Sequence, residues 1–227
     1  MDDMTGRQSN MKSPVVNENE AQNIWDKYQT VRKSIWYYLF LVFVMIAIGF
    51  IAGAFGSLSF SVGHTDSLVN FGSGVNYFWP GIIVQQVGSI WFGAWGILAG
   101  VIFPFLSNAA AQTPFVISLA YIPANFIQAF LPAYIFRHRK LDPRLKSAAD
   151  YLYLLLSMFV GNLIGASWSV LMLIYGFGRL TWSNAGSYFL GWFGGNMIAG
   201  VVFNFVILNA LSQHVILSQI LVKKWWQ

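Results

Sequence analysis

The chain has 227 residues, of which 56% are hydrophobic and 9% are charged, and its formal net charge is +5. A soluble domain carries roughly 25% charged residues, so this composition excludes an ordinary soluble domain and predicts an all-α integral membrane protein. At about 20 apolar residues per crossing, the length suits one compact bundle of about six transmembrane helices. The absence of cysteine excludes disulfides and thiolate chemistry.

The N-terminal segment, residues 1–30, is polar and of mixed charge, unlike a secretory signal peptide. We expect it to stay in the cytoplasm and residues 31–227 to form the transmembrane domain. Residues 17–20 could cap a short amphipathic helix that anchors at the membrane surface or contacts a partner. The apolar side chains of that helix would be Ile24, Trp25 and Tyr28.

Hydropathy predicts four clear crossings and one ambiguous apolar region. The crossings are expected at residues 34–55, 115–136, 151–175 and 186–211. The ambiguous region, residues 77–106, contains the glycine-rich sequence SIWFGAWG.

The positions of Lys and Arg decide how the ambiguous region is counted. These residues cluster at 27–33, 137–146 and 223–224, and the positive-inside rule places all three clusters in the cytoplasm. Two short helices broken around residues 91–93 give the even number of crossings that this placement requires. The prediction is therefore six transmembrane helices, two of them short, with both termini cytoplasmic. A short helix of about 21 Å is tolerated at membrane depth only inside protein or beside a water-filled cavity, so this region should lie near the functional site.

Two loops are expected on the outer side. Residues 56–76 would be either a lid over a pocket or an ordinary connector. The second loop, GFGRLTWSNAGS, contains Arg179, which could pair with an anionic ligand group or extend to the membrane interface.

The polar residues inside the apolar segments are nearly all neutral amides, which need hydrogen-bond partners in hydrocarbon. Some would join helices and others would contact a ligand. In the deduced topology, four asparagines and four aromatic residues fall in the outer half or the middle of the bundle. The predicted substrate-binding residues are Trp79, Asn108, Asn125, Trp168, Tyr175, Asn184, Trp192 and Asn196. Aromatic planes with amides suit a flat, hydrogen-bonding heterocycle.

Small residues recur at four-residue spacing, which predicts close helix packing in lipid. The pairs are Gly49/Gly53, Ala52/Gly56, Gly96/Gly100, Gly161/Gly165 and Gly191/Gly195. The set in the first crossing could instead face another membrane protein.

Residues 79–140, from WPGIIVQQVGSIWFGAWG to AYIFRHRK, resemble the substrate-binding membrane subunit, or S-component, of energy-coupling factor (ECF) vitamin transporters. There a short helix, a glycine-rich break, a second helix with a small polar turn, and a helix ending in a basic loop recur in this order. The resemblance implies a lidded pocket for a water-soluble vitamin or related nutrient in the prokaryotic plasma membrane. It also implies docking of the first helix onto a transmembrane coupling protein that carries two ATP-binding subunits. The docking residues here would be Ala47, Gly49 and Gly53, in place of the family's alanine pair.

The sequence leaves two alternative functions open and argues against several others. A stand-alone secondary carrier or a membrane sensor input module would have similar helices. An enzyme is not expected, because the apolar segments hold no buried His, Asp or Glu for acid–base chemistry. No metal or cofactor is expected, since the three His are scattered, and no nucleic acid, since the basic residues flank apolar segments.

Overall fold

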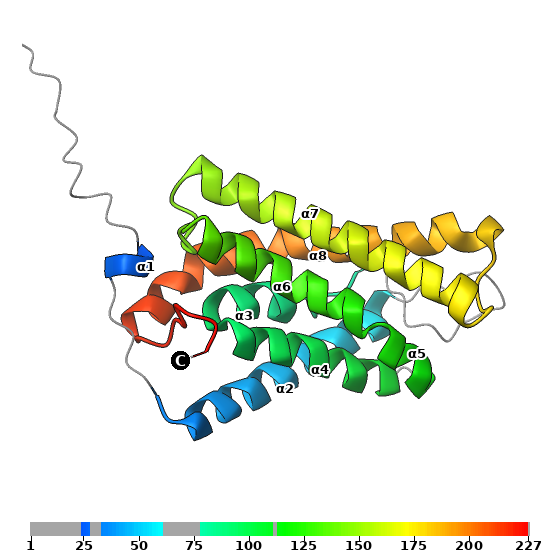
Figure 1. Ribbon diagram of the computed structural model, residues 1–227, viewed down its shortest axis with the longest axis horizontal. Coiled ribbons are helices and arrows are strands. Elements are labelled where there is room, and N and C mark those ends of the chain that lie inside the picture. Colours follow the sequence, from blue (N-terminus) through cyan, green and yellow to red (C-terminus); the bar gives the residue numbers. More distant parts are fainter. Residues whose placement is uncertain (1–23, 28–32, 61–77, 111–112, 227) are drawn as a thin grey trace, which may run out of the picture.

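A computed structural model of the chain describes residues 24–27, 33–60, 78–110 and 113–226, and the regular structure in these ranges is helical. The long helices lie side by side along one axis (Figure 1). In chain order they are α1 (Ile24–Lys27), α2 (Ile35–Phe60), α3 (Ile82–Phe92), α4 (Ala94–Ala110), α5 (Phe115–Ala120), α6 (Ile122–His138), α7 (Ala148–Leu171), η2 (Met172–Gly176) and α8 (Trp182–Leu217). The predicted cap at residues 17–20 and most of the predicted lid, residues 61–76, lie outside the described residues.

Four helical stretches are long and apolar enough to cross a membrane: Ile35–Phe55, Phe115–His138, Ala148–Gly176 and Trp182–Leu217. Two shorter apolar helices, Ile82–Phe92 and Ala94–Ala110, lie between the first two. The prediction of an all-helical chain with four clear spans and two short apolar helices is therefore confirmed.

The break between the two short helices falls at Gly93. Its φ of +61° lies in the left-handed region that favours glycine. The helices then pack against each other so closely that a Cβ on Gly96 would lie 2.1 Å from the Gly88 carbonyl oxygen. The glycines thus allow both the sharp turn and the close contact of the α3–α4 hairpin.

Several predicted boundaries need correction, among them the end of α8 at Leu217, six residues beyond the expected end at 211, and the start of α7 at Ala148, three residues before the expected start at 151. Helix α2 continues to Phe60, so the first residues of the expected loop at 56–76 are helical. Helix α8 begins at Trp182, four residues before the expected start, because its first turns are polar and hydropathy does not register them. The expected crossing at 115–136 divides at Tyr121 into α5 and α6, next to a proline that cannot donate a helical hydrogen bond.

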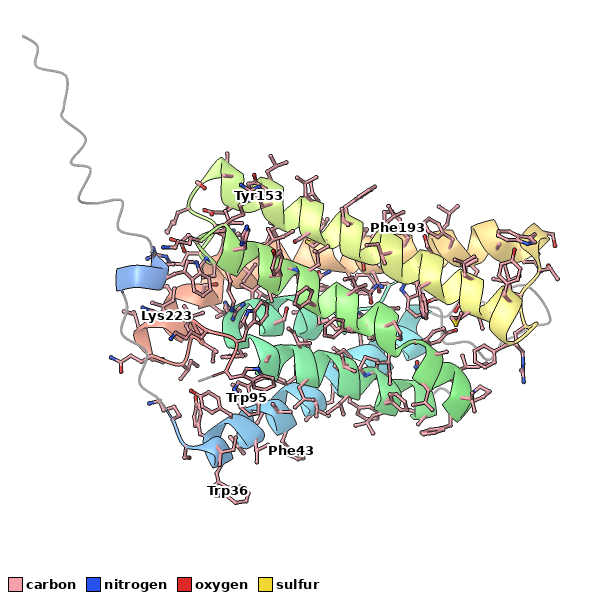
Figure 2. All side chains as sticks on the ribbon, in the orientation of Figure 1. Trp36, Phe43, Trp95, Tyr153, Phe193 and Lys223 are labelled. Carbon is pink, nitrogen blue, oxygen red and sulfur yellow. The ribbon has the colours of Figure 1, made fainter. Side chains whose placement is uncertain are left out.

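Four helices, α3, α6, α7 and α8, form a ring in which each packs on the next, and α4 packs between α3 and α2. Helix α3 has 11 residues and covers only part of the length of its neighbours (Figure 1). Helix α2 is the least buried of the four membrane-length helices. Its Trp36 and Phe43 side chains, 76% and 68% exposed, point away from the bundle (Figure 2).

The loop after α6 and the chain terminus lie at the same end of the bundle, which we call the basic end (Figure 1). There the C-terminal segment, residues 218–226, closes over the α3–α4 turn. The Val222 N–H donates to the Trp91 carbonyl at 2.8 Å, and the Ala94 N–H donates to the Trp225 carbonyl at 3.0 Å. The segment therefore supplies partners for backbone groups that the turn leaves unpaired.

Arg137, at the end of α6, holds this closure together. Its guanidinium lies 5.4 Å from the Trp25 ring and 5.1 Å from the Trp225 ring, and donates to the Ser89 carbonyl at 3.1 Å. A further bond of 2.9 Å reaches the Val222 carbonyl. One cation thus joins α1, α3, α6 and the C-terminal segment.

Helix α7 begins at a capping box in which Ser147 and Asp150 bond each other's backbone N–H groups. Asp150 is buried, and its carboxylate also accepts the Asp142 N–H at 2.9 Å. This carboxylate therefore has a structural role at the basic end.

Candidate functional site

Neutral amides from α3, α6, α7 and α8 are buried where these helices meet. We call this set the amide cluster. Its members are Gln85, Gln86, Asn125, Gln128, Asn162, Asn196 and Asn204, each at most 4% exposed. Asn125 and Gln128 share one face of α6 because residues three apart are neighbours on a helix.

The first hydrogen bonds of the cluster tie the short helix α3 to the helices around it. Gln85 Nε2 donates to the Gly100 carbonyl at 2.9 Å and to Asn125 Oδ1 at 3.2 Å. The next residue, Gln86, points to α8, where its Oε1 accepts from Asn204 Nδ2. Adjacent glutamines thereby bond α3 to α4, α6 and α8.

A second amide pair joins α6 to α7. Gln128 Nε2 donates to Asn162 Oδ1 at 2.9 Å, and Asn162 Nδ2 contacts the Met197 sulfur at 3.4 Å. A thioether is a weak acceptor, so this contact between Asn162 on α7 and Met197 on α8 is a weak hydrogen bond.

Several cluster atoms have no hydrogen-bond partner although they are buried. They are Gln85 Oε1, Gln86 Nε2, Gln128 Oε1 and Asn204 Oδ1. Leaving a buried polar atom unpaired costs about 1–3 kcal/mol. The cluster therefore has spare hydrogen-bonding capacity for a ligand or for water.

Glycines face several of these amides and make room for them. A Cβ on Gly165 would lie 2.9 Å from Gln128 Nε2, and one on Gly200 would lie 3.2 Å from Gln86 Oε1. A Cβ on Gly100 would lie 3.1 Å from the Cα of Gln85. The predicted packing role of Gly100 and Gly165 is confirmed.

An aromatic cluster adjoins the amides on the side away from the basic end. Its members are Tyr121, Tyr188 and Trp192. The two tyrosine hydroxyls lie 2.8 Å apart, and the Trp192 ring meets Tyr121 edge to face at 5.0 Å. Trp192 Nε1 is buried and has no hydrogen-bond partner. Because Tyr121 is one turn from Asn125 and Trp192 one turn from Asn196, both helices present a ring next to an amide.

Of the eight predicted substrate-binding residues, Asn125, Trp192 and Asn196 belong to the amide and aromatic clusters, which the contact between Tyr121 and Trp192 connects. Trp168 lies beside them, where its Nε1 donates to the Ala120 carbonyl at 2.8 Å and so joins α7 to α5. This contact gives Trp168 a structural role.

The other four lie elsewhere. Trp79 stacks on Phe103 at 5.5 Å, between α4 and α2. Tyr175 is 71% exposed on η2. Asn108 is half-buried near the end of α4, and Asn184 is half-buried in the first turn of α8. The sequence position of a residue along a helix predicts its depth in the bundle, but it does not predict which neighbouring helix its side chain faces. Residues predicted at similar depth are therefore separated.

The predicted docking residues also have a different environment from the one expected. A Cβ on Gly49 would lie 2.6 Å from the Phe103 ring, and one on Gly53 would lie 2.7 Å from Ser107 Oγ. Both glycines therefore face α4 within the bundle, and a partner helix could reach them only by displacing α4. Ala47 is half-buried on α2.

Sequence reasoning missed two features, one in the aromatic cluster and one at the basic end. Tyr121 and Tyr188 were not singled out, although their spacing from Asn125 and Asn196 was a usable signal. Arg137 was counted with the basic loop, and nothing local in the sequence indicates that its guanidinium is enclosed by two tryptophans.

The described residues contain no group of three His, Cys, Asp or Glu side chains that could hold a metal ion. The site instead offers neutral donors and acceptors beside aromatic rings. None of its side chains is charged.

The fold and the site define a helical protein with several apolar, membrane-length helices and a buried uncharged polar centre. The chain matches no protein-family model, no curated protein and no solved structure.

Proposed function

We propose that this chain is a membrane-embedded solute-binding protein that acts as the S-component of an ECF-type importer. The observation that carries the proposal is the set of unpaired atoms in the amide cluster, together with the unpaired Trp192 Nε1 one turn before Asn196 on α8. The solute would be a small, neutral, partly planar nutrient such as a water-soluble vitamin.

The chemistry of the cluster supports this class of solute. An amide offers both a donor and an acceptor, so the cluster suits a molecule that carries both. The aromatic cluster adds stacking or edge contacts to a ring. Hydrogen bonds are stronger away from water, which compensates for the absence of a charged anchor.

In the proposed topology the hairpin helices α3 and α4 count as two crossings, and the others are α2, α5–α6, α7–η2 and α8. The basic end would then face the cytoplasm of a prokaryotic cell and the solute would enter from the opposite side. An 11-residue helix rises about 16 Å, so α3 lines only the part of the ring nearer the basic end. Short helices of this kind border binding sites in transporters.

Energy for import would come from other chains, because the sequence has no Gly-x-x-x-x-Gly-Lys-Ser/Thr loop for nucleotide phosphates. The partners would be a transmembrane coupling protein and two ATP-binding subunits. The outer face of α2 is the surface that we assign to docking, in place of Gly49 and Gly53.

A stand-alone secondary carrier is the second candidate, and the closure at the basic end favours it. A carrier needs an inner gate, and the C-terminal segment bound by Arg137 covers the α3–α4 turn at that end. Uptake of a solute by the purified chain alone in liposomes would support the carrier and contradict the S-component.

The test of solute binding is native mass spectrometry of the gently purified protein, with identification of any small molecule that co-purifies. A stoichiometric vitamin-sized compound is expected. Thermal-shift measurements across the water-soluble vitamins provide the second readout. An empty protein with no shift for any vitamin would contradict the proposal.

A further inference from the structure

A groove of about 460 Å³ lies between the end of α7 and the start of α8, at the end of the bundle opposite the basic end. Its lining is apolar apart from one serine. The lining residues are Ser167, Val170, Leu171, Trp182, Ala185, Gly186, Phe189 and Leu190. Leu171, Trp182 and Leu190 are exposed, so the groove opens on the outside of the bundle.

Local features of both helices shape the groove. Helix α7 passes into the π-helical turn η2 directly after Leu171, and such wider turns are frequent at functional sites. On α8, a Cβ placed on Gly186 would meet no atom within 4 Å. The groove therefore owes part of its depth to a missing side chain.

The segment that joins the two helices lining the groove carries one cation, Arg179. Arg179 is the one charged residue between Tyr151 and Gln213 in the sequence. Its N–H donates to the Leu173 carbonyl at 2.8 Å, two residues after Leu171, and it precedes Trp182 by three residues. The side chain is exposed and has no partner among the described residues.

We propose that this groove binds an anionic phospholipid, with an acyl chain along the apolar lining and the phosphate at Arg179. A guanidinium can hold a phosphate through two parallel hydrogen bonds. Trp182 and Tyr175, whose rings lie 6.0 Å apart edge to face, have the amphipathic character of side chains at headgroup level. A guanidinium with no carboxylate partner among the described residues favours a headgroup with net negative charge over a zwitterionic one. No residue that lines the groove belongs to the amide cluster or to the aromatic cluster of the proposed solute site.

The test is native mass spectrometry of the full-length protein in detergent, titrated with phosphatidylglycerol or with phosphatidylcholine. Gly186→Phe fills the groove, and Gly194→Phe is its matched control. A Cβ on Gly194 also meets no atom within 4 Å, and Gly194 does not line the groove. Arg179→Gln removes the charge and leaves the apolar lining intact. Size-exclusion chromatography and helical circular dichroism confirm that each variant is folded.

We expect the wild type to retain phosphatidylglycerol more strongly than phosphatidylcholine. Gly186→Phe should weaken the binding of both lipids about tenfold, which corresponds to losing contact with two acyl methylenes, whereas Gly194→Phe should bind as the wild type. Arg179→Gln should remove the preference for phosphatidylglycerol. The proposal is overturned if the two phenylalanine variants behave alike, or if the preference persists without Arg179.

Discussion

Single atoms in the amide cluster carry the argument for solute binding. A buried indole N–H and amide oxygens without partners are costly in an empty protein, and they become favourable once a ligand supplies the missing hydrogen bonds. Substitutions of single residues therefore test the proposed solute binding most directly.

Trp192→Phe is the first such change, because it keeps an aromatic ring and removes the unpaired Nε1 donor. We expect solute affinity to fall by about 1–3 kcal/mol, in line with the loss of one buried hydrogen bond. Calorimetric titration with the co-purified compound gives the value. Asn184→Ala, on the same helix and outside the cluster, should leave affinity unchanged. Equal affinity in Trp192→Phe and the wild type would remove this nitrogen from the site.

Gly165→Ala tests whether the amides depend on glycine for space. The new Cβ would lie 2.9 Å from Gln128 Nε2. Overpacking of this kind costs about 1–3 kcal/mol, so the midpoint of thermal unfolding should fall. Gly194→Ala is the control, since that Cβ meets open space. A pair of variants with the same midpoint would show that the helices can move apart freely at Gln128.

At the scale of elements, the α3–α4 hairpin depends on one residue in a left-handed conformation. Gly93 and Gly178 have nearly equal φ angles, +61° and +60°. A Cβ on Gly93 would also lie 3.0 Å from the Trp225 carbonyl oxygen, whereas a Cβ on Gly178 would meet no atom within 4 Å. Gly178→Ala should thus cost about 1–2 kcal/mol for the backbone conformation alone. Gly93→Ala should cost more, because it also disturbs the C-terminal segment. Denaturation midpoints of the two variants separate these effects, and a larger loss in Gly178→Ala would contradict this account of the hairpin.

The packing of the C-terminal segment on the α3–α4 turn at the basic end depends on the shape of the Arg137 side chain. Lysine would keep the charge, but it lacks the planar fork that reaches Ser89 and Val222 while lying between two rings. We expect Arg137→Lys to lower the unfolding midpoint and to make the C-terminal segment sensitive to limited proteolysis.

Arg139→Lys is the matched control for this change. Its guanidinium lies over the Tyr153 ring at 5.4 Å but is exposed, so this substitution should be nearly neutral. Resistance of Arg137→Lys to the protease would show that the segment is held by its backbone bonds alone.

At the scale of the whole molecule, the proposed orientation of the bundle in the membrane is tested by chemical labelling from one side. The sequence has no cysteine, so single cysteines introduced at Lys146 and Ser183 are the only thiols that a membrane-impermeant maleimide can label. With an even number of crossings before the basic loop, Ser183→Cys should react in intact cells and Lys146→Cys only after lysis. Reaction of both in intact cells would contradict the six-crossing topology.

Much of the fold was predictable because its signals are local. Long apolar runs gave the four membrane-length helices, and the glycines near Trp91 gave the hairpin break. The ends of α2 and α8 were less predictable, since polar residues such as Asn184 are compatible with a helix as well as with a loop. For the site, depth selected Asn125, Trp192 and Asn196, which lie in the amide and aromatic clusters, and it also selected Trp79 and Tyr175, which lie outside both.

The sequence by itself determined that this is a helical protein with apolar segments of membrane-spanning length. The reason is that the free energy of placing a segment in apolar surroundings depends on its composition and length. Tertiary structure alone decided which face of each helix turns inward. These helices are apolar on nearly all sides, so no polar stripe marks the surface that packs inside. The distance between helix backbones decides that Gly49 faces Phe103 and not a partner protein. It also decides that Asn204 is the amide that bonds Gln86. The close approach permitted at a few glycines thus fixed the arrangement of the amide cluster.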